Sequence, residues 1–436
     1  MSGYAEYREV NLPWLKAVPA HWEIRRNKNI FTEQKEIVGE RSADYTLLSL
    51  TLNGIIPRDM DGGGKFPESF DKYKIVKNGD MAFCLFDIDE TPRTVGLSGY
   101  NGMLTGAYTI MRVSNINARF IYYYYLALDN GKMLRPLYTG LRKTININTF
   151  QSTKVPVPPR EEQDQIVRFL DWKISSINKL INIKKKEIKA IDALKRSMVS
   201  HVITRGLTTD APMKDSGVKW LGDIPAHWKI TKLRQILHPV SEKNHPEFPL
   251  LSVVREQGVI LRDVEDKEAN HNFIPDDLSG YKVVRKGQFA MNKMKAWQGS
   301  YGVSDYTGVV SPAYFIFDIA FENLEYFHYA IRSKVYVNFF AQASDGIRVG
   351  QWDLQMDKMK EIPFIVPPAD EQIAIVKYIK QALPQYNVAI EKLTEEVAVL
   401  EEYKNKVIAD TVTGKIDVRG IEIPEYEFVD EDIDNA

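Results

Sequence analysis

The sequence predicts an α+β protein built from two copies of one domain, with a long helix after each copy. Three observations carry this prediction. Short motifs recur about 206 residues apart, each copy holds short apolar segments bounded by turn residues, and each copy ends in a long heptad-like stretch. The repeat is far longer than the roughly 20–50 residues of a solenoid repeat, so it indicates a duplicated domain. Such a protein can bind two related but different targets at a fixed separation.

The recurring motifs keep the same order in both halves of the chain. The matched pairs are Pro19–Trp22 with Pro225–Trp228, Tyr73–Val76 with Tyr281–Val284, Gly96–Tyr100 with Gly302–Tyr306, Ala107–Tyr108 with Ala313–Tyr314, and Pro158–Gln163 with Pro367–Gln372. The offset between partners stays between 203 and 209 residues, so the insertions in either copy are small. We therefore expect the same fold twice, in tandem.

Length and composition are those of an ordinary globular protein. The chain has 436 residues, of which 44% are hydrophobic and 26% charged, enough for two to four domains. Cys84 is the only cysteine, which excludes an internal disulfide and a cysteine-rich zinc site and fits a reducing cytosol. No secretion signal opens the sequence, and no run approaches the roughly 18 apolar residues of a membrane span. We expect a cytoplasmic protein.

The net charge of −1 hides an asymmetry along the chain. Residues 422–436 hold seven acids and no Lys or Arg, so residues 1–421 carry a net charge of +6. This excess permits contact with DNA through local basic patches but does not predict it alone. The acidic tail is expected to be a solvated, mobile end.

The motifs divide the chain into five predicted segments. These are a first domain (1–159), a first long helix (160–205), a linker with the second domain (206–366), a second long helix (367–413), and a C-terminal segment with the acidic tail (414–436). Strands are predicted for apolar runs bounded by Gly, Asn and Asp, at 45–50, 108–113, 250–254 and 314–317. Helices are predicted for the aromatic stretches at 120–128 and 324–340.

Each long helix begins after a Pro-Pro pair, with acidic residues in its first turn. Apolar residues then follow in alternating steps of four and three, which is a heptad pattern. The predicted seam comprises Leu170, Ile174, Ile177, Ile181, Ile188 and Ile191, and in the second helix Ile379, Leu383, Ile390, Leu393, Val397 and Leu400. Because both helices share one register, we expect an antiparallel pair about 60 Å long. It would serve as a spacer, or alternatively only for dimerisation. Pro384 predicts a kink or break near Leu383.

The chain lacks the residue patterns of common catalytic and cofactor sites. Gly62–Lys65 has neither the spacing nor the Ser or Thr of a phosphate-binding loop, and the Asn-Pro-Pro-Tyr/Phe motif of DNA adenine methyltransferases is absent. The seven histidines lack metal-ligand spacing. His21 and His227 recur, but each lies in a Pro-Ala-His-Trp turn, where a structural role is expected. We expect no catalytic residue, and no metal or cofactor bound by this chain.

Loops between the shared motifs diverge between the copies. Residues Cys84–Arg93 stand where the second copy has Asn292–Gln298. Two readers of different sequences would need one frame with different loops, although neutral drift of surface loops gives the same pattern. Arg and Lys suit guanine and Asn and Gln suit adenine, at about 1–3 kcal/mol for each good bidentate contact.

The candidate DNA-contacting residues lie on these loops. They are Lys65, Arg93, Arg142 and Lys143 in the first copy, and Lys293, Lys295, Gln298, Arg348 and Gln351 in the second. For each of them the alternative is a solvated surface position. Gly140–Arg142 and Gly346–Arg348 keep one arginine in both copies, which favours a phosphate or fold contact over different specificities.

This organisation resembles the specificity (S) subunit of type I restriction–modification enzymes, over the whole chain. The resemblance rests on the two recognition-like domains, each followed by a helix entry at Pro156–Gln163 or Pro363–Gln372, and on the runs Trp220–Trp228 and Gly414–Arg419. The first copy departs from the family pattern at Trp14–Pro19.

The resemblance implies a non-catalytic prokaryotic subunit with two target-recognition domains, each reading half of a bipartite, asymmetric DNA site. It implies that the helices set the gap and that two methyltransferase (M) subunits dock on them, bind S-adenosylmethionine and methylate adenine. Restriction (R) subunits, with ATP and Mg, would join them. Two alternatives stay open. One is a coiled-coil scaffold without sequence preference, and the other is a single-chain nuclease.

Overall fold

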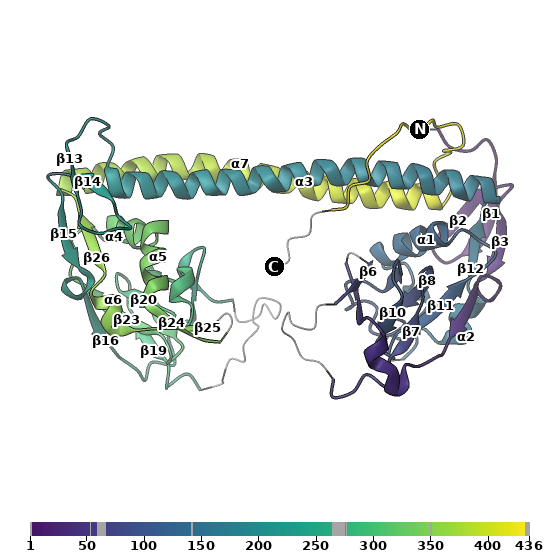
Figure 1. Cartoon of the computed structure of the whole chain (residues 1–436), viewed down its shortest axis with the longest axis horizontal. Coiled ribbons are helices and arrows are strands. Elements are labelled where there is room, and N and C mark those ends of the chain that lie inside the picture. Colours follow the sequence, from purple (N-terminus) through teal and green to yellow (C-terminus); the bar gives the residue numbers. More distant parts are fainter. Residues whose placement is uncertain are drawn as a thin grey trace. The chain divides into compact units, whose positions relative to one another are not determined.

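The computed structural model describes residues 2–52, 54–58, 67–140, 143–263, 275, 277–348 and 351–431 (Figure 1). The chain forms two compact units. Unit 1 is Met1–Lys185 with Thr394–Ala436, and unit 2 is Lys186–Leu393. Each unit contains one of the repeated domains and part of both long helices. Among the described residues, no helix combines the length and the apolar character needed to span a bilayer.

The first domain is built on a four-stranded antiparallel sheet. Its strands, in spatial order, are β4 (Phe31–Gln34), β11 (Thr109–Val113), β8 (Asp80–Phe83) and β9 (Val95–Leu97). Four two-stranded pairs complete it: β1 (Tyr7–Leu12) with β2 (Leu15–Pro19), β3 (Glu23–Arg26) with β12 (Lys154–Val157), β5 (Leu48–Thr51) with β6 (Gly54–Pro57), and β7 (Lys74–Val76) with β10 (Gly102–Leu104). Its helices are α1 (Ala118–Asn130) and α2 (Ile147–Ser152).

The second domain repeats this topology strand for strand. Its sheet has the order β16 (Leu237–Val240), β23 (Phe315–Ile319), β20 (Phe289–Met291) and β21 (Tyr301–Val303). The pairs are β13 (Met213–Asp215) with β14 (Asp223–Pro225), β15 (Lys229–Lys232) with β26 (Pro363–Val366), β17 (Leu251–Val254) with β18 (Gly258–Leu261), and β19 (Lys282–Val284) with β22 (Gly308–Val310). The duplication expected from the motifs is thus present in the fold.

The second domain differs from the first in its helices and in one hairpin. The single helix expected over 324–340 is two helices, α4 (Leu324–Ile331) and α5 (Lys334–Gln342), because the chain turns at Arg332 and Ser333. An additional hairpin follows, made of β24 (Ser344–Arg348) and β25 (Gln351–Leu354), and then α6 (Met356–Lys360). At the corresponding place the described residues of the first domain form an isolated bridge between Thr139 and Thr144.

Aromatic side chains fill both domain cores. Trp22, Phe83, Tyr125 and Phe150 are buried in the first, and Trp228, Phe289, Tyr301 and Tyr326 in the second. Two of the repeated glycines allow close backbone approach. A Cβ atom on Gly102 would lie 2.3 Å from the carbonyl oxygen of Thr46, and one on Gly308 would lie 2.4 Å from that of Pro249. No side chain fits there, which explains why glycine stands at both positions.

The long helices are α3 (Arg160–Arg205) and α7 (Ala369–Val412). In unit 1, Lys404 Nζ lies 3.3 Å from Asn178 Oδ1, and Lys184 Nζ lies 2.9 Å from a Glu396 carboxylate oxygen. The partner numbers fall on one helix as they rise on the other, so the helices are antiparallel there. In unit 2, Lys195 reaches Asn387.

The seam positions differ in burial along the helices. Leu170, Ile177, Ile181 and Ile379 are buried, whereas Ile174, Ile188, Ile191, Leu383, Ile390, Leu393, Val397 and Leu400 are half-buried. Leu170 belongs to the core of the first domain and Ile379 to that of the second.

The break expected near Leu383 is absent, because α7 continues through Pro384 as one helix. Proline removes the hydrogen bond to the carbonyl four residues earlier, at Lys380. Lys380 and Pro384 are both exposed, so water has access to this part of the helix surface.

Part of the acidic tail is bound to the helices, whereas its composition predicted a solvated, mobile end. Over residues 427–431 it lies along α3, held by side chains of that helix. Val429 N donates to Ser175 Oγ (2.8 Å), Asn178 Nδ2 donates to the Val429 carbonyl (3.2 Å), and Asn182 Nδ2 donates to the Asp430 carbonyl (2.9 Å). We call this segment, 427–431, the strap.

Glu431 closes the strap by accepting from Lys185 Nζ and Lys404 Nζ, which come from different helices. These hydrogen bonds lower the pKa of Glu431 although partial burial opposes the shift. Polar side chains at spacings of three and four on one face of α3 bind the strap, and the composition of the tail carries no sign of them.

Candidate nucleic-acid interface

Two of the repeated motifs, the Pro-Ala-His-Trp turn and the Pro-Pro helix entry, contact each other at the start of each long helix. In the first domain Trp22 Nε1 donates to Glu162 Oε1 (2.9 Å), and His21 Nε2 lies 2.7 Å from Glu162 Oε2. Tyr4 Oη donates to the same carboxylate (2.6 Å). Burial and this hydrogen bond raise the pKa of Tyr4. The Pro-Ala-His-Trp turn thereby anchors the domain to its helix, and the structural role expected for His21 is observed.

The second domain uses the same anchor. Trp228 Nε1 donates to Glu371 Oε2 (2.9 Å), and His227 contacts the other carboxylate oxygen. The glutamine that follows the acid is also used twice. Gln163 Nε2 donates to the Pro158 carbonyl, and Gln372 Nε2 donates to the Pro367 carbonyl, each at 2.8 Å. The conformation in which each domain enters its helix is therefore fixed by repeated side chains.

Above this shared frame, each domain presents one divergent loop beside one turn or hairpin. In the first domain these are residues 84–94, between β8 and β9, and the described residues of 138–145. Together they are called the first module. In the second domain they are residues 292–300, between β20 and β21, and the hairpin β24–β25. They are called the second module.

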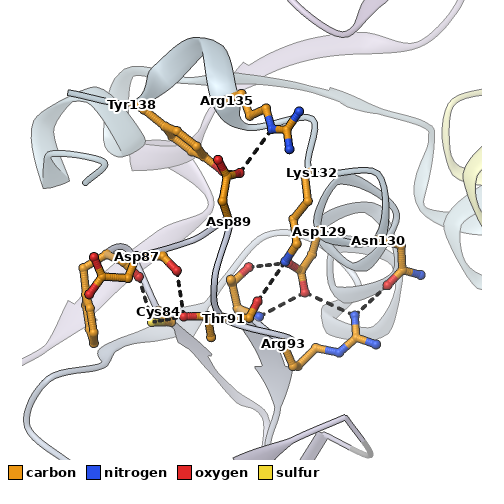
Figure 2. Close-up of polar contacts among 12 residues, drawn as sticks. Cys84, Asp87, Asp89, Thr91, Arg93, Asp129, Asn130, Lys132, Arg135 and Tyr138 are labelled. Atoms are coloured by element: carbon orange, nitrogen blue, oxygen red, sulfur yellow. Dashed lines mark hydrogen bonds and ion pairs between the residues drawn. The ribbon is translucent and has the colours of Figure 1, made fainter. Parts of the chain in front are cut away.

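Two carboxylates organise the first module (Figure 2). Asp129, at the end of α1, is 2% exposed. It accepts hydrogen bonds from the backbone and side chain of Thr94 (3.0 and 2.7 Å), and pairs with Arg93 (3.2 Å) and Lys132 (2.9 Å). The end of the loop is thus tied to the helix by a buried, fully bonded carboxylate.

Asp89 is the second of these carboxylates, and it joins the loop to the turn. Arg135 Nε and Lys143 Nζ each lie 3.1 Å from its oxygens, and Tyr138 Oη donates to it at 3.2 Å. Desolvation opposes ionisation of Asp89, but the bonds from Lys143 and Arg135 outweigh it and lower its pKa. Burial and the neighbouring Asp89 raise the pKa of Tyr138 to about 12, so its hydroxyl remains a donor at neutral pH.

The second module is held by an ion pair and by two tryptophans. Lys293 Nζ lies 3.0 Å from Asp353 Oδ1. The Trp297 and Trp352 rings are stacked, with centroids 5.4 Å apart and an interplanar angle of 25°. Trp352 is 37% exposed, so part of this stack is open to solvent.

The structure gathers most of the candidate DNA contacts into these modules. Arg93 and Lys143 lie in the first module, and Lys293, Lys295 and Gln298 lie in the second. Arg348 and Gln351 belong to β24 and β25, but their side chains lie outside the described residues, as do Lys65 and Arg142 entirely. Lys295 is exposed and Gln298 is half-buried.

Three of the basic candidates are paired within the chain. Arg93 is bound to Asp129 and Asn130, Lys143 to Asp89, and Lys293 to Asp353. Sequence reasoning missed these acids because isolated Asp residues are common in a chain with 58 acids. The recurrent Gly-Leu-Arg and Gly-Ile-Arg were the available signal, since Gly140 lies in the turn segment of the first module and Gly346 in β24 of the second. Among the described residues, no cluster of three or more His, Cys, Asp or Glu is placed to hold a metal ion.

The comparisons with known proteins point to one family. Residues 70–190 match the family described as the type I restriction modification DNA specificity domain. The type I restriction enzyme MjaVIII specificity subunit of Methanocaldococcus jannaschii is 24% identical, over 95% of this chain and 98% of that protein. The putative type I restriction enzyme MjaX specificity subunit of the same organism is 23% identical, over 92% and 95%.

One solved structure supports the fold. It comes from work on complex assembly and conformational transition of the type I R-M system, and it matches with a TM-score of 0.58 at 13% identity. The match covers 92% of this chain and 99% of that one. At this identity the likeness concerns the fold alone, with its two repeated domains and long helices.

Proposed function

We propose that this chain, which belongs to the type I restriction–modification specificity subunits, selects the DNA sequence on which a methylating complex acts. Each domain reads one half of a bipartite, asymmetric site. The observation that carries the proposal is the repeated frame with two different modules. Anchors, sheets and close-packed glycines are kept in both domains, whereas loops, turns and ring stacks differ.

The chemistry of the modules suits the edges of bases and the phosphate backbone. Basic and amide side chains gather there, and Lys and Arg paired with buried or half-buried carboxylates stay ordered before DNA arrives. The net charge of +6 over residues 1–421 supplies a modest attraction for DNA. We expect sequence preference to come from direct contacts rather than from charge.

The long helices are proposed to set the gap between half-sites and to receive two methyltransferase subunits. Exposed apolar residues remain on both helices in each unit. They are Leu180, Ile183, Val399 and Tyr403 in unit 1, and Leu194, Ile373, Tyr378 and Val388 in unit 2. Such residues mark surfaces that partners cover. S-adenosylmethionine would bind to the methyltransferase subunits, and ATP and Mg to restriction subunits. The complex would act on DNA in a prokaryotic cytoplasm.

The proposed role is non-catalytic, which distinguishes it from a single-chain nuclease. A coiled-coil scaffold without sequence preference is the other alternative. It predicts DNA binding that depends on salt but not on sequence. The divergent modules favour specificity, because a scaffold has no use for two different ordered loops on one frame.

The test is a base-resolution methylation map of DNA from cells that express this chain with its methyltransferase subunit. We expect a new N6-methyladenine motif that is split in two by a fixed gap. Exchange of either domain would then change only one half of the motif. If the complex forms and no new motif appears, the specificity proposal is wrong.

A further inference from the structure

In both domains, the divergent loop and the turn or hairpin are joined by one equivalent backbone hydrogen bond. Ile145 N donates to the Leu85 carbonyl at 2.9 Å, and Leu354 N donates to the Lys293 carbonyl at 3.3 Å. Leu85 and Lys293 each stand two residues after a central strand, β8 or β20. Ile145 and Leu354 each stand two residues before a short helix, α2 or α6, and both are buried.

Beside this shared bond lies an ion pair whose polarity is reversed between the domains. In the first module the loop supplies the acid, Asp89, and the turn supplies the base, Lys143. In the second module the loop supplies the base, Lys293, and the hairpin supplies the acid, Asp353. The backbone bond is therefore equivalent in the two modules, whereas the acid and the base of the neighbouring ion pair are exchanged between the loop and the turn or hairpin.

We propose that each loop and the turn or hairpin of its own domain form one specificity unit. The side on which this ion pair carries its acid and its base matches the loop to that turn or hairpin and excludes the one of the other domain. The inference rests on the proposed function. Its chemistry is simple. A first-domain turn against a second-domain loop would set a lysine on each side of the joint, Lys143 and Lys293, and the opposite mixture would set an aspartate on each side, Asp353 and Asp89. Like charges at a joint disfavour wrong combinations more than opposite charges stabilise right ones.

Partial exposure of the pairs agrees with a role in selection rather than in stability. The side chains are 44% and 20% exposed for Lys143 and Asp89, and 33% and 25% exposed for Lys293 and Asp353. Ion pairs of this exposure add little to folding. They do fix where a loop sits, and a small displacement of a base-reading loop removes contacts. Asp89 and Asp353 are thus positioning residues.

The experiment uses the full chain in its complex with methyltransferase subunits, and reads the methylation map. In Asp353→Lys, two cations oppose each other in the second module. We expect methylation of the cognate motif to fall about tenfold or more, or the second half-site to become degenerate, while the first half-site is kept. Asp353→Glu keeps the polarity and is expected to retain the second half-site.

Two further variants complete the test. Asp89→Lys is the counterpart in the other domain and should affect only the first half-site, so the test survives if one variant fails to fold. Lys358→Ala removes an ion pair with Asp345 that joins α6 to the hairpin and not to the loop. It should leave both half-sites unchanged.

The outcomes separate this inference from the proposed function. If the wild-type map shows no split motif, the proposed function fails and the inference falls with it. If the wild-type motif is split and Asp353→Lys and Asp89→Lys leave it unchanged, only the inference is overturned. The same holds if Asp353→Glu is as damaging as Asp353→Lys, because polarity then plays no part.

Discussion

The indole of Trp22 donates a hydrogen bond of 2.9 Å to the carboxylate of Glu162, 140 residues further along the chain. Trp228 and Glu371 repeat this bond at 2.9 Å across 143 residues. The two motifs that seemed independent in the sequence are halves of one contact. This contact fixes each recognition domain to the helix that follows it, so its loss is expected to loosen the domain without altering the modules.

Replacing Glu162 with alanine should destabilise unit 1. Glu162 is 5% exposed and accepts from Trp22 and Tyr4, whose donors would be left buried without partners. Each such group costs about 1–3 kcal/mol, so the free energy of unfolding measured in urea should fall by about 2–6 kcal/mol. Glu371→Ala is the matched control, because the Glu371 side chain is 32% exposed and water can replace it. Equal effects of the two substitutions would contradict this account.

Gly102→Ala and Gly308→Ala should each lower the free energy of unfolding by about 1–3 kcal/mol, because the new methyl group meets a backbone carbonyl that cannot move aside. Gly99→Ala and Gly280→Ala are the controls, since a Cβ atom at either position would meet no other atom within 4 Å. Thermal unfolding of the four variants compares them directly. If a control variant is as unstable as Gly102→Ala or Gly308→Ala, the close approach to the carbonyl oxygen is not the cause of the lost stability.

The stability of unit 2 should fall as the pH drops from about 6.5 to about 4. Burial, and then the nearby Arg332, lower the pKa of His328 to about 4, while its Nδ1 accepts from Val303 N at 3.3 Å. The folded state therefore keeps His328 neutral where the unfolded state binds a proton. Its contribution is fully present above pH 6.5 and is lost on acidification, by on the order of 2–3 kcal/mol. In His328→Gln the unfolding free energy should depend less on pH over this window, and an unchanged slope would refute the assignment.

Deleting residues 427–436 should weaken unit 1 by about 1–3 kcal/mol, because the hydrogen bonds of the strap are lost and Lys185 and Lys404 lose their shared carboxylate. The matched control deletes only residues 432–436 and leaves Glu431 in place. Hydrogen exchange along the first half of α3 should rise in the longer deletion alone. Equal exchange in both deletions would mean that the strap does not hold this helix.

The isolated chain should self-associate unless methyltransferase subunits cover the exposed apolar residues of its helices. Replacing Leu194 and Val388 with glutamine should raise the monomeric fraction, measured by size-exclusion chromatography with light scattering. Both residues are more than half exposed, so folding should be unaffected. A stable, monodisperse wild-type monomer would argue against a docking surface of this kind.

Sequence reasoning predicted the architecture because its signals were local or repeated. The motif offsets gave the duplication, the heptad pattern gave α3 and α7, and alternating apolar runs gave strands such as β11 and β23. Features that depend on remote partners could not be predicted. The strap needs Ser175, Asn178 and Asn182 on α3, more than 240 residues away in sequence.

The sequence predicts where the candidate interface lies better than it predicts the contacts that its side chains make. The divergent loops were found because everything around them repeats. Residue type alone did not reveal that Arg93, Lys143 and Lys293 are already paired with Asp129, Asp89 and Asp353. An ion pair between segments distant in sequence leaves no pattern in a single chain, whereas a repeated glycine or tryptophan does.

The reversed joint also limits how the chain can be recombined. A crossover within the shared anchor motifs transfers a whole domain, and both its loop and its turn travel together. A crossover between the loop and the turn, in contrast, sets two lysines or two aspartates at one joint. Recombination can therefore exchange a whole domain without loss. Recombination between the loop and the turn of one domain instead gives a protein with repelling charges at that joint.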